Sequence, residues 1–352
     1  MILVVNAGSS SLKLALFDAG QQVAQARAEG IGTGGAATHA QALASGLAEM
    51  GHPVLTAAAH RVVHGGVGLT KACRITPEVQ AQIAALVPLA PLHNPPALAG
   101  IEALRALQPD LRQYASFDTA FHATNPEVAL RYAIPQGQHD AGIRRYGFHG
   151  ISYASLVTTL RDRGDLPQRL LACHLGNGAS LCAIRDGVSV ATTMGYSPLD
   201  GLTMGTRAGG IDGNAVLALA GELGVAAAGD LLNRASGLLA LGGSNDMRQT
   251  GAFAREHFIY WAVRHAGSMV AAMGGLDAMV FTGGIGENDV GVRAGIVAGL
   301  GYMGAVMDPV ANGAGAGQVH DPASHVAIWT VPAAEEAHIA REASQIIAGE
   351  GA

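Results

Sequence analysis

The chain has 352 residues, of which 49% are hydrophobic and 14% are charged, and this length predicts two domains. The hydrophobic content excludes a globally disordered chain, and 49 glycines without a Gly-X-Y repeat exclude collagen. The net charge of −6 argues against a dedicated binder of nucleic acid or of membrane surfaces, although a few local arginines suffice for an anionic substrate.

The cysteines and the N-terminus predict a cytoplasmic protein. Cys73, Cys173 and Cys182 form no paired motif, which is typical of reduced thiols in the cytosol. The N-terminus lacks the basic segment of a signal peptide, so we expect none. We also expect no membrane span, because the long apolar stretches are interrupted by charges or helix breakers.

In the first half of the chain, strands are expected to alternate with helices. Two apolar runs around a Gly/Ser/Asn loop predict an N-terminal hairpin. Thr76 is a typical N-cap because a proline follows it, and an Asn-Pro pair starts the next helix. We expect strands at 2–5, 12–17, 55–63 and 114–117, and helices that begin at Pro77 and at Asn94.

The second half continues the alternation, which predicts an α/β protein with helices that cover a central sheet. Two strands enclose the loop Gly176-Asn177-Gly178, and a turn follows at Asp186-Gly187. A glycine loop is expected at 283–288. We expect strands at 170–174, 180–184, 278–281 and 326–331, and helices from Ile151, over 252–273, from Val290 and over 333–347.

One internal similarity predicts that the two halves of the chain are related. The segment VVNAGSSSLKLAL resembles ACHLGNGASLCAI, with Gly8 matching Gly176 and Ser11-Leu12 matching Ser180-Leu181. Each segment is typical of a strand, a small-residue loop and a returning strand. A unit that repeats half a chain apart indicates an internal duplication, while coincidence in a chain rich in Gly, Ala and Ser is the alternative.

The two small-residue loops are candidates for phosphate binding. The loop from Asn6 to Ser11 exposes backbone N–H groups, and Lys13 adds a point charge. The second loop follows His174, and the glycines around Asn177 let a ligand approach the backbone closely. Each loop alone is at least as typical of an ordinary hairpin turn. Together they favour a phosphate clamp from two sides.

Arg61 and Asp118 are candidates for carboxylate and metal chemistry. Arg61 and Val63 share one face of a strand, which suits a small carboxylate with a short hydrocarbon end. An exposed arginine is the commoner alternative. Asp118 follows a strand at the edge where α/β sheets bind ligands, so it can hold Mg²⁺ or orient a nucleophile. A helix N-cap is an equal alternative for this aspartate.

Two further side chains are candidates for contact with phosphate charge. His149 precedes a helical run, and the dipole at a helix N-terminus favours anions. A structural role is the commoner one for a lone histidine. Arg207 lies in a glycine loop, from which it can reach the charge on a transferring phosphoryl group. An exposed loop arginine is the alternative.

The remaining candidate segments suit a nucleotide. Residues 246–248 can bind a ribose or a base, and a surface turn is equally typical of them. Residues 282–288 lie between a strand and a helix, which suits a phosphate loop, although the full G-x-G-x-x-G spacing is absent. Glu335 and Glu336 open the last helix, where a carboxylate caps the helix dipole or binds Mg²⁺.

Taken together, these segments resemble the acetate kinase family of the superfamily that contains acetate and sugar kinases, Hsp70 and actin. The resemblance runs from Asn6 to Glu335, and its strings occur in the family's order. They are NAGSSSLK, HRVVHGG, PLHNP, FDTAFH, YGFHG, HLGNGAS, GTR, SNDMR, FTGGIGEN and a final EE pair.

The resemblance implies two α/β domains on a duplicated ribonuclease H-like core of the actin and Hsp70 type, with ATP in the cleft between them. It implies an N-terminal domain of residues 1–120 plus 336–352 and a second, nucleotide-binding domain of residues 121–335. It also implies a phosphotransferase with a carboxyl group acceptor, which reversibly transfers the γ-phosphoryl group of ATP to acetate and gives acetyl phosphate and ADP. Mg²⁺, with Mn²⁺ as an alternative, and a homodimer are further implications.

The resemblance also implies a role for each matching residue. Asp118, Arg61, His149 and Arg207 are catalytic, while Asn6 and Glu335 bind the metal. The acetate pocket is formed by Arg61, Val63, Leu92, His93, Phe148 and Pro198. The ATP site is formed by Lys13, His174, Leu175, Gly176, Asn177, Gly178, Asp246, Met247, Arg248, Gly284, Ile285, Gly286, Glu287 and Asn288.

The sequence departs from the family pattern at a few positions and in length. Val67 replaces a glutamate, Gly210 an aspartate, and Ala333-Ala334 a polar pair, and the chain is shorter than usual. Two alternatives stay open: a kinase for propionate or another short-chain acid, and a superfamily ATPase without acyl kinase activity. The two arginines and Asp118 argue against the ATPase, because it needs no carboxylate pocket.

Overall fold

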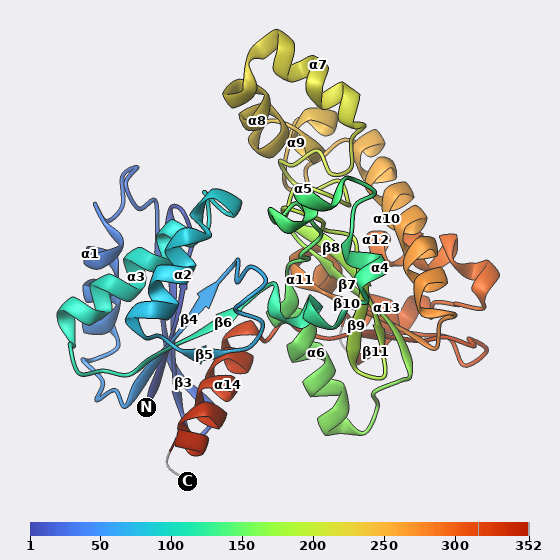
Figure 1. The fold of residues 1–352 in the computed structure, drawn as a ribbon. Coiled ribbons are helices and arrows are strands. Elements are labelled where there is room, and N and C mark those ends of the chain that lie inside the picture. Colours follow the sequence, from blue (N-terminus) through green and yellow to red (C-terminus); the bar gives the residue numbers. More distant parts are fainter. Residues whose placement is uncertain (316, 351–352) are drawn as a thin grey trace. The chain divides into compact units, whose positions relative to one another are not determined.

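The computed structural model describes residues 1–315 and 317–350 (Figure 1). The chain divides into two compact units. The first unit comprises Met1–Ala123, Gly150–Ser155 and the C-terminal residues from Ala334, and the second comprises Thr124–His149 and Leu156–Ala333. The domain boundaries expected after residues 120 and 335 stay predictions.

The first unit is built on a mixed sheet. Its N-terminal hairpin closes through Gly8, whose N–H donates to the Ser11 carbonyl at 2.8 Å. Strands β1, β4 and β6 are mutually parallel, and the other strands run antiparallel to their neighbours. Within the described residues the order is β3-β2-β1-β4-β6-β5, with bounds Ile2–Ala7 (β1), Ser11–Asp18 (β2), Gln21–Glu29 (β3), Ala57–Val62 (β4), Cys73–Arg74 (β5) and Gln113–Phe117 (β6).

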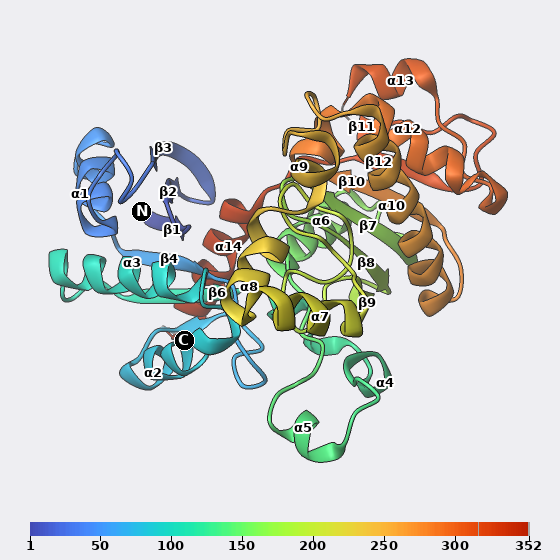
Figure 2. The ribbon, with the colours of Figure 1, turned by 90° about the horizontal axis from the view of Figure 1, so that it is seen from above.

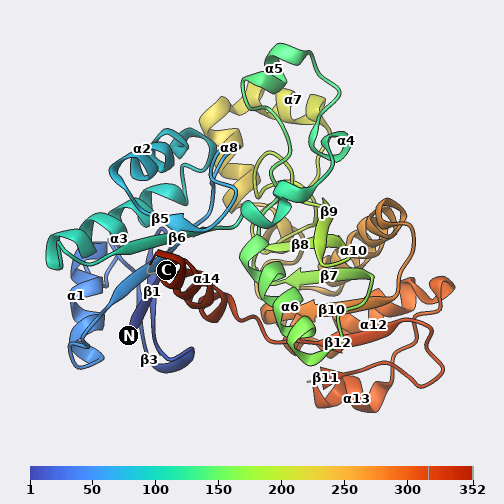
Figure 3. The same cartoon turned by 60° about the horizontal axis from the view of Figure 1, so that its bottom comes forward.

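Helices cover both faces of this sheet because alternate residues of each strand point to opposite sides. Helices α1 and α3 pack on the face that carries Leu3 and Leu14, and α14 packs on the face that carries Val4 and Phe17 (Figures 1 and 3). The bounds are His39–Glu49 (α1), Pro77–Ala85 (α2), Asn94–Leu107 (α3) and Glu335–Glu350 (α14), with 3₁₀ turns at Val87–Leu89 (η1) and Ala120–Thr124 (η2).

The second unit contains a sheet of the same kind. In the described part of this unit the order is β11-β12-β10-β7-β8-β9, and β7, β10 and β12 are mutually parallel. The bounds are Arg169–Leu175 (β7), Ala179–Arg185 (β8), Val188–Thr192 (β9), Ala278–Thr282 (β10), Gly317–Gln318 (β11) and Ala327–Thr330 (β12).

A long helix, α10, lies along β8 and β9, and α12 packs on it (Figure 2). Helix α6 begins in the first unit and continues into the second. The bounds are Glu127–Leu130 (α4), Gln136–Asp140 (α5), Gly150–Arg163 (α6), Gly213–Leu223 (α7), Val225–Arg234 (α8), Gly237–Gly242 (α9), Ala252–Met273 (α10), Gly283–Asn288 (α11), Val290–Gly299 (α12), Gly301–Met303 (η3) and Pro309–Ala314 (α13).

The two sheets match strand by strand, which confirms the predicted duplicated fold. Reading from β3 to β5 and from β9 to β11 gives the same sequence of antiparallel and parallel neighbours. Each half also has a tight turn with two positive φ angles, at Ala19-Gly20 and at Asp186-Gly187. Such turns follow the right-handed twist of the strands that they join.

Several predicted elements agree with the structure, and one is wrong. Helix α2 begins at Pro77 as expected, and Thr76 Oγ1 accepts a hydrogen bond from the Val79 N–H at 3.3 Å. The segment expected as a glycine loop is the short helix α11. Strand β3 and helix α1 fall where the sequence predicted no element. Along the described stretch of the chain, no helix combines the length and apolar character that a membrane span requires.

Candidate active site

In the first unit, strand β4 positions Arg61. Its neighbours His60 and Val62 point into the core and are 1% and 0% exposed. The alternation of the strand therefore turns Arg61 to the other face, where 22% of its side chain is exposed. Strand β4 ends at Val62, and Val63, which follows directly, is half-buried. The face predicted to be shared by Arg61 and Val63 stays a prediction.

Asp118 fixes the guanidinium of Arg61. Arg61 Nη2 lies 2.7 Å from Asp118 Oδ2, and Arg61 Nε donates to the same oxygen at 3.1 Å. The backbone N–H of Asp118 donates to the Val62 carbonyl at 3.0 Å, which places the carboxylate just beyond the end of β6. The side chain of Asp118 is 1% exposed, so the pair is largely removed from water.

Burial dominates the electrostatics of this pair. It raises the pKa of Asp118 to about 6, an effect that Arg61 opposes and Glu335 reinforces. Burial also lowers the pKa of Arg61, but Asp118 and Glu335 outweigh it and hold that pKa above its usual range. Arg61 is therefore a permanent cation held in one orientation.

Two residues with oxygen ligands, which the family resemblance assigns to a metal, lie beside Arg61. Asn6 Oδ1 is 3.4 Å and Glu335 Oε2 is 3.8 Å from Arg61 Nη1. Among the described residues no three His, Cys, Asp or Glu side chains gather as a metal site. A protein site for Mg²⁺ commonly supplies one or two oxygens and leaves the rest to phosphate and water, so this donor set fits that ion.

In the second unit, His149 occupies a backbone conformation that is uncommon for any residue other than glycine. Its φ is 59°, in the left-handed region, at the start of α6. His149 Nδ1 lies 2.8 Å from Ser180 Oγ, and its ring stacks on that of His174 with centroids 4.1 Å apart. Such a strained position persists only where surrounding contacts hold it, and it is typical of functional sites.

Arg207 lies near residues 176–178, the second of the two loops that the sequence predicts to bind phosphate. Its Nη1 donates to the Pro198 carbonyl at 3.3 Å, and burial lowers its pKa. A Cβ placed on Gly178 would lie 3.2 Å from His149 Nε2 and 3.6 Å from Arg207 Nη1. The structure thus brings His149 and Arg207 to one glycine of the predicted phosphate loop.

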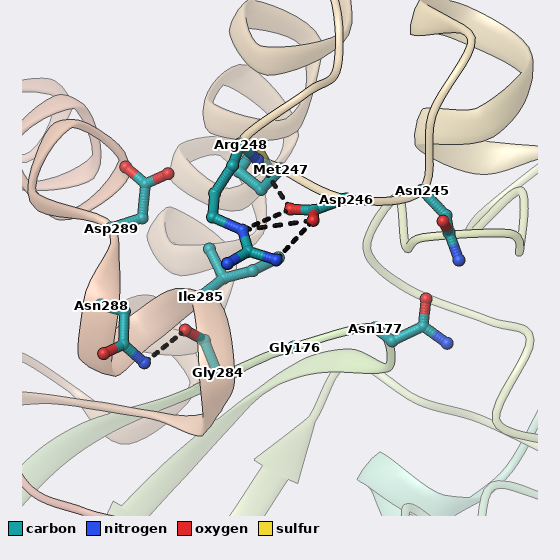
Figure 4. Close-up of a pocket in the computed structure, with 10 residues that line it drawn as sticks. All are labelled: Gly176, Asn177, Asn245, Asp246, Met247, Arg248, Gly284, Ile285, Asn288 and Asp289. Carbon is teal, nitrogen blue, oxygen red and sulfur yellow. Dashed lines mark hydrogen bonds and ion pairs between the residues drawn. The ribbon is translucent and has the colours of Figure 1, made fainter. Parts of the chain in front are cut away.

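A pocket of about 320 Å³ opens beside this loop in the second unit (Figure 4). Arg248 and Asp246 form a two-pronged ion pair at it, with Nη2 2.6 Å from Oδ2 and Nε 2.9 Å from Oδ1. The hydrogen bonds from Arg248 lower the pKa of Asp246 to about 2. The pocket is lined by Gly176, Asn177, Asn245, Asp246, Met247, Arg248, Gly284, Ile285, Asn288 and Asp289.

Most of the residues assigned to ATP line this pocket, and some do not. Glu287 contacts backbone instead, because its Oε1 accepts from the Gly283 N–H at 2.9 Å and from the Ala333 N–H at 3.0 Å. Lys13 is exposed in the first unit, where it lines a different hollow together with Glu336. Assigned residues outside the lining are Lys13, His174, Leu175, Gly178, Gly286 and Glu287.

Sequence reasoning missed Arg293, which holds α11 in place. This side chain is 0% exposed, and its Nη1 donates to the carbonyls of Gly286 and Glu287 at 2.9 and 2.8 Å. Its Nε donates to Asn312 Oδ1 at 2.7 Å. A cation that bonds the last carbonyls of a helix interacts favourably with the helix dipole, so Arg293 stabilises the C-terminal end of this glycine-rich helix. No local signal in the sequence pointed to it.

The residues assigned to the acetate pocket are divided between the units. Val63, Leu92 and His93 belong to the first unit and are half-buried. Phe148, which is 1% exposed, and Pro198 belong to the second. Their joint role stays a prediction.

Comparisons with known proteins agree on one family. The model of the Acetokinase family matches residues 1–341. The acetate kinase of Methylocella silvestris is 41% identical over 388 residues, covering 97% of this chain and 96% of that protein. The structure of Porphyromonas gingivalis acetate kinase has 34% identity and a TM-score of 0.89, covering 98% and 99% of the two chains. A propionate kinase from Francisella tularensis has 35% identity and a TM-score of 0.91, covering 97% and 98%. A duplicated fold and near-complete coverage together show that this chain belongs to the acetokinase family.

Proposed function

We propose that this protein is an acetate kinase, which reversibly transfers the γ-phosphoryl group of ATP to acetate and gives acetyl phosphate and ADP. The observation that carries the proposal is Arg61, a permanent cation that Asp118 orients and that lies two residues before the half-buried Val63. A cation next to a small apolar side chain matches a carboxylate with a methyl group. The names of the relatives support the same substrate.

The chemistry needs positioning and charge stabilisation more than it needs a base. Acetate is already an anion, so its oxygen can attack the γ-phosphorus without losing a proton. Two anions must nevertheless meet, and cations offset their repulsion. Arg61 binds the acetate carboxylate, and Asp118 prevents the guanidinium from turning away.

His149 and Arg207 act on the phosphoryl group in this proposal. Ser180 and His174 hold the ring of His149, which leaves Nε2 at Gly178. Arg207 brings a positive charge to the same glycine. Charge that spreads over the equatorial oxygens in the transition state is stabilised by such fixed donors.

ATP and a divalent cation complete the proposal. We assign the adenosine to the pocket of Figure 4, between the Asp246–Arg248 pair and α11, and the phosphates to the loop 176–178. Asn6 and Glu335 would hold Mg²⁺, or Mn²⁺ as the alternative, and the ion would neutralise charge on the phosphates. Lys13 would add a further positive charge to the phosphates.

One assay separates the candidate functions. ADP formation from ATP is measured with acetate, with propionate and without any acid. Acetate-dependent ADP formation is the expected result, whereas equal rates with and without acid would contradict the proposal and favour an ATPase.

Propionate is the second candidate, because a propionate kinase shares the fold at 35% identity. An added methylene in a fitted pocket changes kcat/KM by about 10–200-fold, so acetate should be preferred over propionate. Val63→Ala should raise the relative use of propionate. A wild-type protein with equal or better kcat/KM for propionate would overturn the acetate assignment.

We also propose a homodimer in the cytoplasm. Helix α7 has no buried residue, and Leu217 on it and Val225 at the start of α8 are 70% and 82% exposed. Helices α7 and α8 pack on each other, and large apolar side chains exposed on neighbouring helices favour a protein interface. Cys73, Cys173 and Cys182 are not joined in disulfides, and unpaired cysteines are typical of proteins in a reducing compartment.

A further inference from the structure

Arg255 joins two walls of the pocket in Figure 4 that are far apart in the sequence. It lies near the start of α10, and its Nη1 donates to the Met247 carbonyl at 3.4 Å. Its Nη2 pairs with Asp289 Oδ1. Met247 and Asp289 both line the pocket. One guanidinium therefore bonds the turn that carries Asp246–Arg248 and the junction between α11 and α12.

The Asp289 end of this link is itself rigid. Asp289 Oδ1 accepts from the Val292 N–H at 2.9 Å and so caps α12. The Asp289 side chain is 12% exposed and that of Arg255 is 33% exposed, so the pair is partly shielded from water. Such a pair is stronger than a fully exposed one, because screening by solvent and salt is weaker.

The turn that carries Met247 depends on Arg255 for its position more than Asp289 does. The turn is held internally by the Asp246 carbonyl, which accepts from the Gln249 and Thr250 N–H groups at 2.9 Å each. The Arg248 side chain is 85% exposed, and its guanidinium bonds Asp246, which belongs to the same turn. These bonds fix the shape of the turn but not its distance from α11.

We propose that Arg255 is a positioning residue that sets the spacing of the nucleotide pocket and thereby its affinity for adenine nucleotides. The inference rests on the proposed function, because it takes the pocket to be the nucleotide site. A guanidinium suits this position because its planar fork bonds two acceptors at once, whereas an ammonium is a single point of charge. Without the link, nucleotide binding would have to order the turn, and that cost lowers affinity.

The test measures ADP binding by calorimetry, without added metal, for the full-length protein, four single variants and one double variant. Arg255→Gln removes the positive charge, and Arg255→Lys keeps the charge but can bond only one of the two acceptors. Asp289→Asn keeps the cap of α12 and removes the negative charge that pairs with Arg255. The matched control is Arg169→Gln. Arg169 forms a comparable arginine–aspartate pair with Asp277 in the same unit, outside the pocket.

Arg255→Gln should weaken ADP binding about tenfold, since a hydrogen bond to a charged group is lost, and Arg255→Lys should restore part of it. KM for ATP should rise, while kcat and KM for acetate change less than about twofold. This pattern is expected when a variant weakens nucleotide binding equally in the ground state and in the transition state. Asp289→Asn should act similarly, and combining it with Arg255→Gln should add little.

The outcomes separate the inference from the proposed function. Wild-type protein that binds no ADP would contradict the assignment of the pocket. Wild-type protein that binds ADP, with Arg255→Gln binding equally well, would overturn the role of Arg255 alone. Equal weakening by Arg169→Gln would also overturn it, because the effect would then follow general stability.

Discussion

Arg61 and Asp118 depend on each other for their ionisation and their orientation. The arginine is the counter-charge of a carboxylate that is 1% exposed, and the carboxylate bonds the guanidinium through two of its nitrogens, Nε and Nη2. Removing one member of a buried pair leaves the other as an uncompensated charge. Substitution at Arg61 therefore changes both catalysis and stability.

Arg61→Ala should lower kcat/KM for acetate by about 10²–10³, the usual effect of removing one fixed donor from a transition state. Purified variant and wild type are compared in the ADP assay, with circular dichroism as the control for folding. A folded variant that retains more than about a tenth of wild-type activity would show that Arg61 has another role.

Glu335→Ala should raise the Mg²⁺ concentration needed for half-maximal activity. The reason is that Glu335 Oε2 lies beside Asn6 Oδ1 at Arg61 Nη1, and carboxylate oxygens are preferred Mg²⁺ ligands. The residue also opens α14, where a carboxylate stabilises the helix dipole. An unchanged Mg²⁺ titration together with a lower Tm would assign Glu335 to helix capping instead.

At the scale of single elements, the loops that carry Asn177 and Gly205 approach each other so closely that position 205 requires glycine. A Cβ on Gly205 would overlap with Asn177 Oδ1, and the Gly205 N–H donates to the Asn177 carbonyl at 3.0 Å. Such an overlap forces the Asn177 side chain, or the loop that carries it, to move. Asn177 lines the nucleotide pocket, so the displacement falls on the proposed site.

Gly205→Ala should therefore weaken ADP binding by about tenfold or more, since displacements near 1 Å are costly in preorganised sites. Gly213→Ala is the control, because nothing lies within 4 Å of its Cβ position at the start of α7. That variant should bind ADP normally and have equal or higher Tm, since alanine favours helix. Equal affinity in both variants would mean that the loops tolerate the added methyl group.

Strand β4 and the residues after it make the first unit sensitive to acid. Burial lowers the pKa of His60 to about 4, partly opposed by the hydrogen bond to Gln113, and burial lowers that of His64 to about 4. In the unfolded chain both rings protonate near pH 6.5. Between pH 6.5 and about 4 the unfolded state therefore binds more protons, and stability falls as the pH falls.

The titration of Asp118 has the opposite effect on stability. Because its pKa is raised, the folded state binds a proton between about pH 6 and 3.8, and this stabilises the fold as the pH falls. Two histidines outweigh one aspartate, so the free energy of unfolding should fall by about 1.4 kcal/mol per pH unit below about pH 6. Urea unfolding at a series of pH values from neutral to about 5 measures this slope. Stability that stays constant or rises over that range would show that the buried rings do not govern it.

For the whole molecule, the proposed dimer explains the exposed apolar side chains of α7 and α8. Leu217→Glu combined with Val225→Glu should convert the dimer to monomer, because burying carboxylates in an apolar interface is unfavourable. Light scattering after size-exclusion chromatography measures the mass of each. Val310→Glu, at an 81% exposed valine of α13, is the control. A wild-type protein with the mass of one chain would contradict the dimer.

The sequence alone determined much of the architecture, because its strongest signals are local. Apolar runs around small-residue loops predicted both hairpins, Thr76-Pro77 predicted the start of α2, and the resemblance of the two hairpin segments predicted the duplicated sheets. Strand β3 and helix α1 lacked such signals, since alanine and polar residues dominate them. The motifs that indicate the family are also local, because each is a short string and the strings follow one another in a fixed order.

Only the tertiary structure decided which side chains meet. Arg61 gathers Asp118, Asn6 and Glu335 from segments that are distant in the chain, and this depends on the order of strands in the sheet. Arg293 stabilises the glycine-rich helix α11 from outside that segment, because it bonds the Gly286 carbonyl and Asn312. Arg255 joins two pocket walls in the same way. Local propensity extends over a few residues, whereas these contacts require the packed fold. The family resemblance assigned Arg61, Asp118, Asn6 and Glu335 to the site, but no sequence pattern gave their contacts, and none pointed to Arg293 or Arg255.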